Sequence, residues 1–323
     1  MWKKIKINLV QHEEIGIAAA LIIVFIIFGI ADPAFVSGVN LVRLFRQACI
    51  LGIMAIGVVY VIMCNGIDVS VGAILAVSST IAAQMMISGY HVVIAVGSAV
   101  AAGTFLGMLN GFIVTKLGIK ELIATFAASY IIRGLLLQIS GAKWLTNLPG
   151  EFTFIGQGSV LGIPVPFFLL LAVLTAGYIF SNYTPLGRQV KAIGGNAEAA
   201  VLSGVSITKI KILTFTICGF GAGIAGVIYA ARIGAVQSNA GEGMEFEVIS
   251  AAMIGGADFN GEGSPMGAFL GALLLTAIKN GMVILGVSSF MEGVVTGGLI
   301  LLALLVNMFR GKYENSLEVA GNE

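Results

Sequence analysis

Long apolar runs follow one another along almost the whole of this 323-residue chain, and they constrain its fold more than any other feature. A helix needs about 20 mostly apolar residues to cross a hydrocarbon core roughly 30 Å thick. Hydrophobic residues make up 58% of the chain and charged residues only 10%, whereas soluble domains carry about 25% charged residues. So few charges cannot cover a water-facing surface. The sequence therefore predicts one all-α domain, 1–323, built as a polytopic bundle of transmembrane helices surrounded by membrane lipid.

Ten apolar runs are long enough, or nearly so, to be membrane spans. They occupy residues 15–30, 49–63, 69–88, 92–115, 122–139, 167–180, 212–230, 246–255, 266–285 and 294–308. The eighth run, 246–255, would extend only about 15 Å as a helix at a rise of 1.5 Å per residue. That run crosses the membrane only if flanking residues join it, and on that condition we expect about ten crossings.

Basic residues gather in four clusters between or beside these runs. The clusters are 3–6, Lys116 with Lys120, 188–211, and Arg310 with Lys312. Cytoplasmic loops are enriched in Lys and Arg, and ten crossings put all four clusters on one side. We therefore predict a cell (inner, plasma) membrane protein with both termini in the cytoplasm. The first cluster resembles the start of a signal peptide, but no small-residue cleavage pattern follows it, so the first run is predicted to stay attached as a span.

Glycines spaced by four residues recur in two similar heptapeptides. Residues 103–109 read GTFLGML and residues 267–273 read GAFLGAL, which suggests that spans two to five and seven to ten form a repeat of inverted topology. Such a glycine spacing makes a smooth stripe on which another helix can pack closely. The alternative is that 44 glycines produce these spacings by chance. The predicted helix-packing glycines are Gly103, Gly107, Gly111, Gly263, Gly267 and Gly271.

A polar interruption, NGIDVS at residues 65–70, separates the second run from the third. Polar groups at membrane depth are costly and usually face a cavity or a partner. A bent helix here would also free backbone groups that neighbours or a water-filled path must satisfy. We predict that Asn65, Asp68 and Ser70 line the path of a transported solute. The alternative is that Asp68 caps the following helix in a short solvated loop.

Four further ionisable residues lie inside or beside apolar runs. Glu245 and Glu247 precede a short run, where acids interact favourably with the helix dipole; a role in gating is the alternative. Arg133 and Lys279 can extend their charged ends to the membrane surface if they lie near the ends of their spans. If Lys279 lies midway along its span it needs a counter-charge, and the sequence does not identify which acid supplies it.

The largest polar interruption lies between the sixth and seventh runs, with residues 183–211 as a predicted cytoplasmic loop. Asn196 can cap a short helix within this loop, and Gly204 can end that helix. The helix is rich in small residues and has basic flanks. This composition indicates a segment that another protein grips.

This loop resembles the coupling loop of the permeases in the ribose-type branch of ATP-binding-cassette sugar importers. Stretches 65–72, 241–252 and 254–264 fit the same family, so the resemblance covers nearly the whole chain. One departure is Ala257-Asp258, where the family commonly has Thr or Ser followed by a small residue.

The resemblance implies a division of labour among several chains. A separate cytoplasmic ATPase would use ATP and dock on the loop, an extracytoplasmic binding protein would deliver a monosaccharide such as ribose, and a second permease copy or a homologue would complete the path. The coupling residues that the resemblance implies are Gly194, Gly195, Asn196, Glu198, Ala199, Ala200, Ser203 and Gly204.

The sequence predicts neither catalysis nor a cofactor bound by this chain. It lacks a Gly-x-x-x-x-Gly-Lys-Ser/Thr phosphate loop, and its two histidines and three cysteines show no metal-ligand spacing. A net charge of +1 gives no general attraction to nucleic acid. Two alternatives to an importer permease remain. One is a gradient-driven carrier in which Asp68 binds a proton or sodium, and the other is a structural or channel-like membrane protein.

Overall fold

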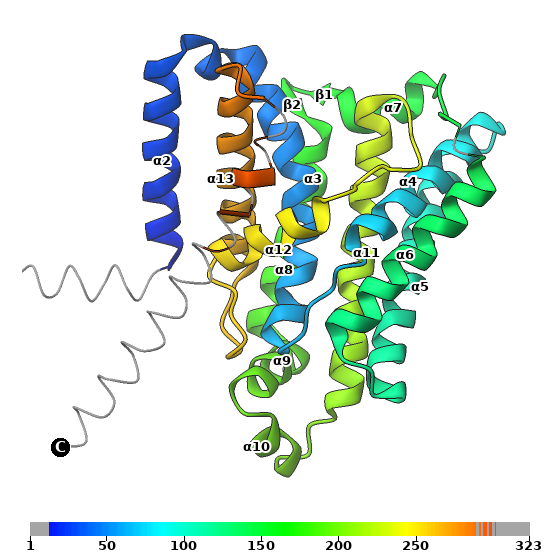
Figure 1. Ribbon diagram of the computed structural model, residues 1–323, viewed down its shortest axis with the longest axis vertical. Helices are drawn as coiled ribbons and strands as arrows, with labels where there is room; N and C mark the ends of the chain where they lie inside the picture. Colours follow the sequence, from blue (N-terminus) through cyan, green and yellow to red (C-terminus); the bar gives the residue numbers. More distant parts are fainter. Residues whose placement is uncertain are drawn as a thin grey trace, which may run out of the picture.

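The computed structural model describes residues 13–141 and 143–288, together with 291, 293–295, 297–298 and 301. Within them the chain is a bundle of helices with one short antiparallel hairpin, β1 (Ser159–Val160) and β2 (Ile163–Pro164) (Figure 1). The helical elements are α2 (Glu13–Ala31), the 3-10 turn η1 (Pro33–Val36), α3 (Gly38–Met63), α4 (Val71–Ile87), α5 (Val92–Leu117), α6 (Glu121–Ser140), α7 (Gly150–Gln157), α8 (Val165–Tyr183), α9 (Pro185–Gly195), α10 (Ala197–Leu202), α11 (Ile207–Ile233), α12 (Met244–Ile254) and α13 (Pro265–Ile284). The prediction of an all-α bundle is confirmed.

The outside of the bundle is apolar. Among the described helices, seven are long and apolar enough to cross a membrane, and α4 is a shorter apolar helix. On the outermost helix, α2, the side chains of Ile22, Ile23 and Ile27 are more than half exposed. A surface of this kind is stable in hydrocarbon and not in water. The protein is therefore a multi-pass membrane protein, as the composition predicts.

The helix ends collect in two layers, which we name the α7 end and the α10 end after the helices that lie there (Figure 1). At the α10 end, Ser264 donates a hydrogen bond to Glu14 (2.8 Å) and the Cys64 thiol approaches the Val190 carbonyl (3.9 Å). At the α7 end, Gln157 donates to the Arg232 carbonyl (3.0 Å). These contacts place the starts of α2 and α13, the end of α3 and helix α9 at the α10 end, and the ends of α7 and α11 at the α7 end.

Two crossings are broken. After α3 reaches the α10 end, residues 64–70 run without helical structure and α4 begins at Val71, inside the bundle. After α11 reaches the α7 end, residues 235–243 form a bridge, turns and extended chain before α12 begins at Met244. The predicted eighth span is therefore only an 11-residue helix. Its non-helical flanks complete the passage from Val236 at the α7 end to Gly261 at the α10 end.

The two halves of the chain share this order of elements in opposite directions. The long helix α3 runs from the α7 end to the α10 end, whereas the long helix α11 runs the other way, and each is followed by a break and a shorter helix. This arrangement agrees with an inverted repeat for spans two and three against spans seven and eight, and the extension of the repeat to spans five and ten stays a prediction. Most of the predicted tenth span, 294–308, lies outside the described residues.

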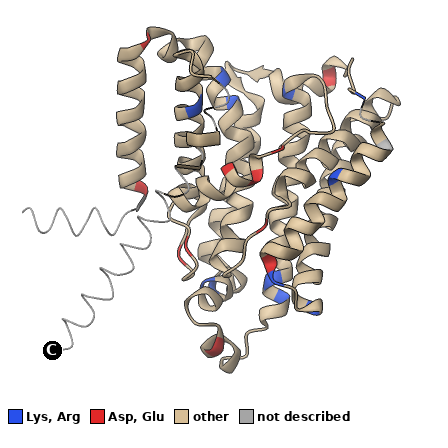
Figure 2. Cartoon of the chain, viewed as in Figure 1, with Lys and Arg blue, Asp and Glu red and all other residues tan. Residues whose placement is uncertain are grey.

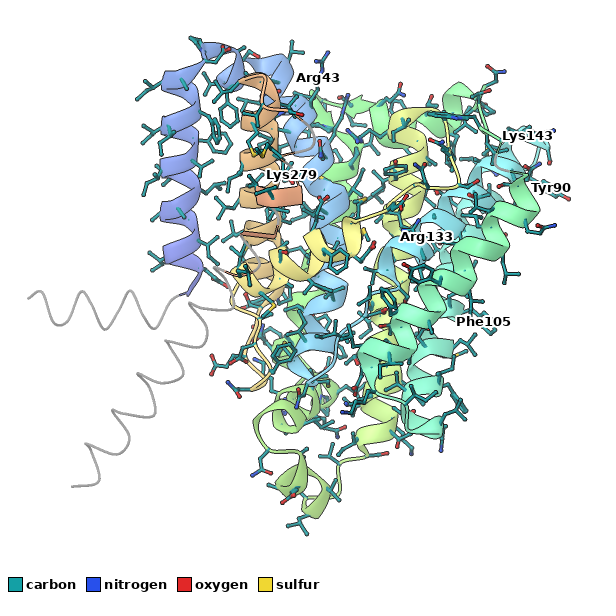
Figure 3. The ribbon with its side chains drawn as sticks, in the orientation of Figure 1. Arg43, Tyr90, Phe105, Arg133, Lys143 and Lys279 are labelled. Carbon is teal, nitrogen blue, oxygen red and sulfur yellow. The ribbon has the colours of Figure 1, made fainter. Side chains whose placement is uncertain are left out.

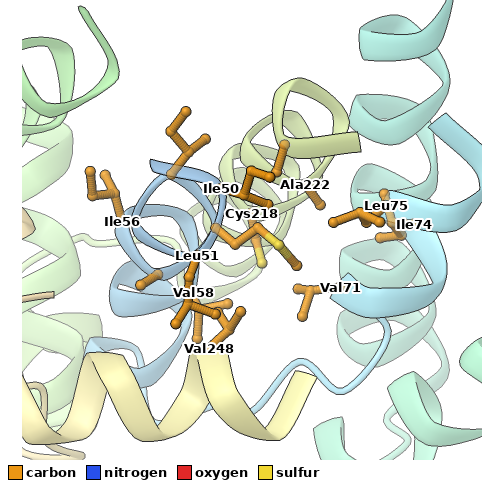
Figure 4. Packing of buried hydrophobic residues seen from close by; sticks show 14 of the residues in the cluster. Ile50, Leu51, Ile56, Val58, Val71, Ile74, Leu75, Cys218, Ala222 and Val248 are labelled. Atoms are coloured by element: carbon orange, nitrogen blue, oxygen red, sulfur yellow. The ribbon is translucent and has the colours of Figure 1, made fainter. Parts of the chain in front are cut away.

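The centre of the bundle is formed by α3, α4 and α11, with α12 packed beneath them (Figure 4). Gly103, Gly107 and Gly111 of α5 lie against the backbone of α11, where added Cβ atoms would come within 2.8 Å of Gly223, Gly219 and Ile212. Gly267 and Gly271 of α13 lie against the carbonyls of Gly255 and Ala251 in the same way. Close backbone packing of this kind is what small residues permit in a membrane.

Gly263 does not belong to a helical stripe. Its φ of 148° lies outside the helical region, and α13 begins only at Pro265, after the N-cap residue Ser264. The prediction of a triple stripe at Gly263, Gly267 and Gly271 is therefore wrong in its first member. The cause is local, because the Ser264 hydroxyl accepts the Gly267 N–H (2.9 Å) and fixes the helix start there.

Candidate functional site

The first break is held by a buried polar chain that starts at Asp68. One oxygen of the Asp68 carboxylate accepts hydrogen bonds from the Ser70 N–H (2.9 Å) and the Ser70 hydroxyl (2.6 Å). The Ser70 oxygen in turn accepts from the Asn110 amide of α5 (2.7 Å). Asp68 and Ser70 expose none of their surface. This network ties the start of α4 to α5.

A second fastening ties the same break to α6. The Val69 N–H donates to the Thr125 hydroxyl oxygen (3.1 Å), and Thr125 donates to the Glu121 carbonyl one turn earlier (2.9 Å). Thr125 thereby satisfies a backbone group that no helix would satisfy here. The break has fixed geometry because side chains from two neighbouring helices replace its missing helical hydrogen bonds.

The three predicted path residues are not brought onto one surface in this conformation. Asn65 is exposed at the α10 end, with a φ of 57°, whereas Asp68 and Ser70 are buried. The alternative prediction, a cap on α4, matches the bond from Asp68 to the Ser70 N–H, although the loop is buried and not solvated. The path-lining roles of Asp68 and Ser70 stay predictions.

We expect Asp68→Ala to destabilise the protein by about 1–3 kcal/mol, because the Ser70 N–H and hydroxyl would lose their buried acceptor. Thermal unfolding of the detergent-solubilised protein measures the change. Glu151→Ala, which removes an exposed acid from α7, is the matched control. Equal unfolding temperatures for both variants would contradict the network's structural role.

The second break is held by Arg133, from the interior of α6 (Figure 3). Its guanidinium donates to the carbonyls of Ala240 (3.3 Å) and Gly241 (3.2 Å) and lies 3.8 Å from the Glu245 carboxylate. Glu245 also accepts the Gly243 N–H (3.3 Å) beside the start of α12, which agrees with the predicted position of an acid at that helix terminus. Arg133 therefore does not extend to the membrane surface. It satisfies backbone carbonyls that the break leaves free.

The two breaks meet inside the bundle at Gly72 and Gly241. A Cβ atom on Gly72 would overlap the Glu245 carboxylate and come within 2.5 Å of the Gly241 carbonyl, and one on Gly241 would come within 2.8 Å of the Gly72 carbonyl. Gly241 also has a φ of 66°, which L side chains rarely adopt. The start of α4 and the segment that precedes α12 therefore lie in backbone contact. Discontinuous helices that meet in this way form the solute sites of many transporters.

Lys279 of α13 is paired with Glu247 of α12 at 2.8 Å, with both side chains largely buried. The pair borders a cavity of about 110 Å³ that Gln47 and Tyr229 also line. This answers the question that the sequence left open, since Glu247 supplies a counter-charge for Lys279.

At the α10 end, Lys211 of α11 forms an ion pair with Glu121 of α6. The pair borders a cavity of about 510 Å³ that Asn65, Lys120 and Phe259 also line. The pair joins the start of α11 to the start of α6. Nothing in the local sequence around either residue indicates this contact.

The predicted coupling loop forms two short helices, α9 and α10, at one end of the bundle (Figure 1). The Asn196 side chain accepts the Ala199 N–H (2.9 Å) and caps α10, and Gly204 follows with a φ of 82°, as the sequence predicts. Six of the predicted coupling residues are exposed, namely Gly195, Asn196, Glu198, Ala199, Ser203 and Gly204. Two are not, because Ala200 is buried and Gly194 packs on the Met63 carbonyl and Gly261.

Sequence reasoning missed Asn110 and Thr125, which sit as single polar residues inside apolar runs. Their only signal is that an amide or hydroxyl in hydrocarbon needs a partner. Among the described residues, no three His, Cys, Asp or Glu side chains gather closely enough to hold a metal ion.

Apolar crossings surrounding two broken helices that meet in the interior define a multi-pass membrane transport protein. Comparison with known proteins narrows this class. The family model described as branched-chain amino acid transport system / permease component matches residues 40–304. The chain belongs to this family of permease components.

Three relatives cover nearly all of the chain. The ribose import permease protein RbsC of Bacillus subtilis is 38% identical over 91% of this chain and 92% of its own length. The protein of the same name from Escherichia coli K12 is 35% identical over 89% of this chain and 91% of its own length. The D-allose transport system permease protein AlsC of Escherichia coli K12 is 34% identical over 93% of this chain and 93% of its own length. No solved structure was found to match.

Proposed function

We propose that the chain is the permease subunit of an ATP-binding-cassette importer and forms the translocation path for a ribose-like monosaccharide. Relatives that are named as ribose and D-allose permeases, each matching about nine-tenths of this chain, support the sugar assignment. A separate ATPase hydrolyses ATP, and an extracytoplasmic binding protein delivers the sugar. The observation that carries the coupling to the ATPase is α10, an exposed capped helix that stands clear of the bundle.

The α10 end faces the cytoplasm in this proposal. Lys and Arg residues gather there on the α5–α6 turn, on α9 and at the start of α11 (Figure 2). Cytoplasmic loops carry such an excess of basic residues. Since α2 starts at the α10 end, the start of α2 faces the cytoplasm in this proposal, and the α7 end faces the binding protein.

A direct mechanical connection links α10 to the breaks. α10 is separated from α11 by only a short turn, and the Lys211–Glu121 pair fastens the start of α11 to the start of α6. Along α6, Thr125 holds the first break and Arg133 holds the second. A displacement of α10 by the ATPase therefore reaches both breaks through α6. Alternating access requires such movement of the walls around a fixed site.

A second permease copy, or a homologue, supplies the opposite wall of the path. The outward face of α6 carries Ile123, Phe126 and Tyr130, each of them about half exposed or more. In a two-fold assembly this face of one copy lies opposite the same face of the other. Lipid covers the remaining apolar surface.

We expect Glu198→Arg to reduce co-purification of the ATPase by about ten-fold, since one reversed charge at an interface commonly costs more than 1.4 kcal/mol. Glu198 is exposed in the first turn of α10 and does not contribute to the core. The matched control is Glu151→Arg, the same change on an exposed residue of α7 at the other end of the bundle. Both variants should insert into the membrane. Unchanged co-purification of Glu198→Arg would remove the docking claim.

A further inference from the structure

The second break presents polar groups on the bundle surface below the α7 end. The Ser238 hydroxyl contacts the Ser140 hydroxyl (2.7 Å) at the last residue of α6, and Gly241 accepts a bond from Arg133, seven residues back along the same helix. Seven residues of helix correspond to about 10 Å. The chain from Ser238 to Gly241 therefore descends well into the span.

Two polar side chains of this descending segment are exposed, Asn239 and Glu242. Neither belongs to a helix, and a turn hydrogen bond from the Glu242 N–H to the Asn239 carbonyl (3.1 Å) takes the place of regular helical bonding. A carboxylate facing lipid at this depth would also be costly. Non-helical backbone is tolerated at membrane depth only where it is buried in protein or lines a water-filled cavity, and the side chains of this segment are exposed. This surface therefore faces water.

Two exposed aromatic rings lie on the elements next to these polar groups, α12 and α6. Phe246 lies in the first turn of α12, four residues after Glu242, and is about half exposed (48%). Tyr130 is 68% exposed and lies three residues before Arg133 on α6, so it neighbours the residue that donates to Ala240 and Gly241. The centroid of the Phe126 ring lies 4.9 Å from that of the Tyr130 ring.

We propose that Asn239, Glu242, Tyr130 and Phe246 form the surface of the path that contacts the sugar. The carboxylate and the amide match the hydroxyl groups of a monosaccharide, while the aromatic rings match the apolar C–H face of its ring. A few polar groups set among aromatic side chains are the usual composition of a small-molecule site. The proposal rests on the proposed function and names the contact residues of its path.

Arg133 and Glu245 are positioning residues for this surface. Both are largely buried, and they hold the carbonyls of Ala240 and Gly241 and the start of α12. The exposed residues lie directly beside these fixed points, with Asn239 before Ala240, Glu242 after Gly241 and Phe246 after Glu245. The contact surface is thus built on a rigid base.

Water access is tested first, by cysteine substitution in the full chain. The native Cys49, Cys64 and Cys218 are buried, so a membrane-impermeant maleimide should leave the unsubstituted protein unlabelled. We expect Asn239→Cys and Glu242→Cys to react in intact vesicles. Ile23→Cys, on the exposed apolar face of α2, is the control that lipid should shield. If Asn239→Cys and Glu242→Cys resist the reagent as Ile23→Cys does, the surface faces lipid or a tightly packed partner, and the proposal is overturned.

Sugar contact is tested with the complete importer in proteoliposomes. We expect Glu242→Gln and Phe246→Leu each to lower ribose uptake by about ten-fold or more. A site built for a sugar's hydroxyl groups loses favourable interaction with the sugar when one of the contacting side chains is replaced. Stimulation of the ATPase by the loaded binding protein should persist. Phe105→Leu, the same aromatic change on an exposed residue in the middle of α5 and away from both ends of the bundle, should leave uptake unchanged.

Three outcomes overturn the proposal. Uptake within about two-fold of the unsubstituted importer for both variants would mean that these residues do not contact the sugar. A parallel loss of uptake and of subunit assembly would assign the surface to a protein interface. If the unsubstituted complex imports neither ribose nor allose, the proposed function itself fails. The maleimide result would then still report, independently, whether water reaches this surface.

Discussion

Substituting valine for Gly107 is expected to prevent stable folding of the protein. A Cβ atom at this position would overlap the Phe215 carbonyl and lie 2.8 Å from the Gly219 Cα, both of which are backbone atoms of α11. Backbone cannot rotate away as a flexible side chain can, so α5 and α11 would have to separate. Overpacking of a close-packed core commonly lowers the free energy of unfolding by about 1–3 kcal/mol. Because Gly107→Val would also force two helices apart, we expect a loss of about 3 kcal/mol or more.

Gly97→Val supplies the matched control, because Gly97 lies on the same helix and an added Cβ there meets no atom within 4 Å. Size-exclusion chromatography of the detergent-extracted variants gives the readout. We expect a monodisperse peak for Gly97→Val and aggregated or absent protein for Gly107→Val. Equal yields and elution volumes for the two would show that α5 does not pack on α11 through Gly107.

The second large loss of stability is expected for Lys279→Met. This change leaves the Glu247 carboxylate partly buried beside α13 without the ammonium that now lies 2.8 Å away. Removing one partner of a buried ion pair commonly costs about 3–5 kcal/mol, whereas replacing both partners with neutral groups can be nearly neutral. We therefore expect a strong loss of thermal stability for the single variant.

The double variant, Lys279→Met with Glu247→Gln, should recover most of the lost stability. Unfolding temperatures of the two single variants and the double variant, measured in one detergent, complete a thermodynamic cycle. Additive losses would mean that the two side chains do not interact and would refute the pairing. A double variant more stable than Lys279→Met alone is the expected result.

The crossings could be predicted from the sequence because hydrophobic length has a direct physical meaning in a membrane. The α10 helix could be predicted equally well, since the Asn196 cap and the left-handed Gly204 are local signals. The starts of helices inside the bundle were harder to predict from the sequence. The third run was expected to begin at residue 69, and α4 begins at Val71, because the Asp68–Ser70 bonds hold residues 68–70 out of the helix.

The polar pairings could not be predicted, because they join residues far apart in the chain. Ser70 meets Asn110 across 40 positions, Arg133 meets Gly241 across 108, and Lys211 meets Glu121 across 90. A sequence rich in apolar residues shows that each of these groups needs a partner, but helix packing decides which partner it finds. The same limitation explains why Asn65 and Asp68, only three residues apart, lie in different surroundings.

The roles of α10 and the two breaks depend on one claim, that ATP hydrolysis in a partner drives sugar through this chain. The direct measurement is uptake of labelled ribose into proteoliposomes that contain the chain, its ATPase and enclosed ATP, with the binding protein outside. We predict accumulation only when all four components are present. Accumulation by the chain alone under a proton or sodium gradient, or passive flux through it without any energy source, would contradict the claim.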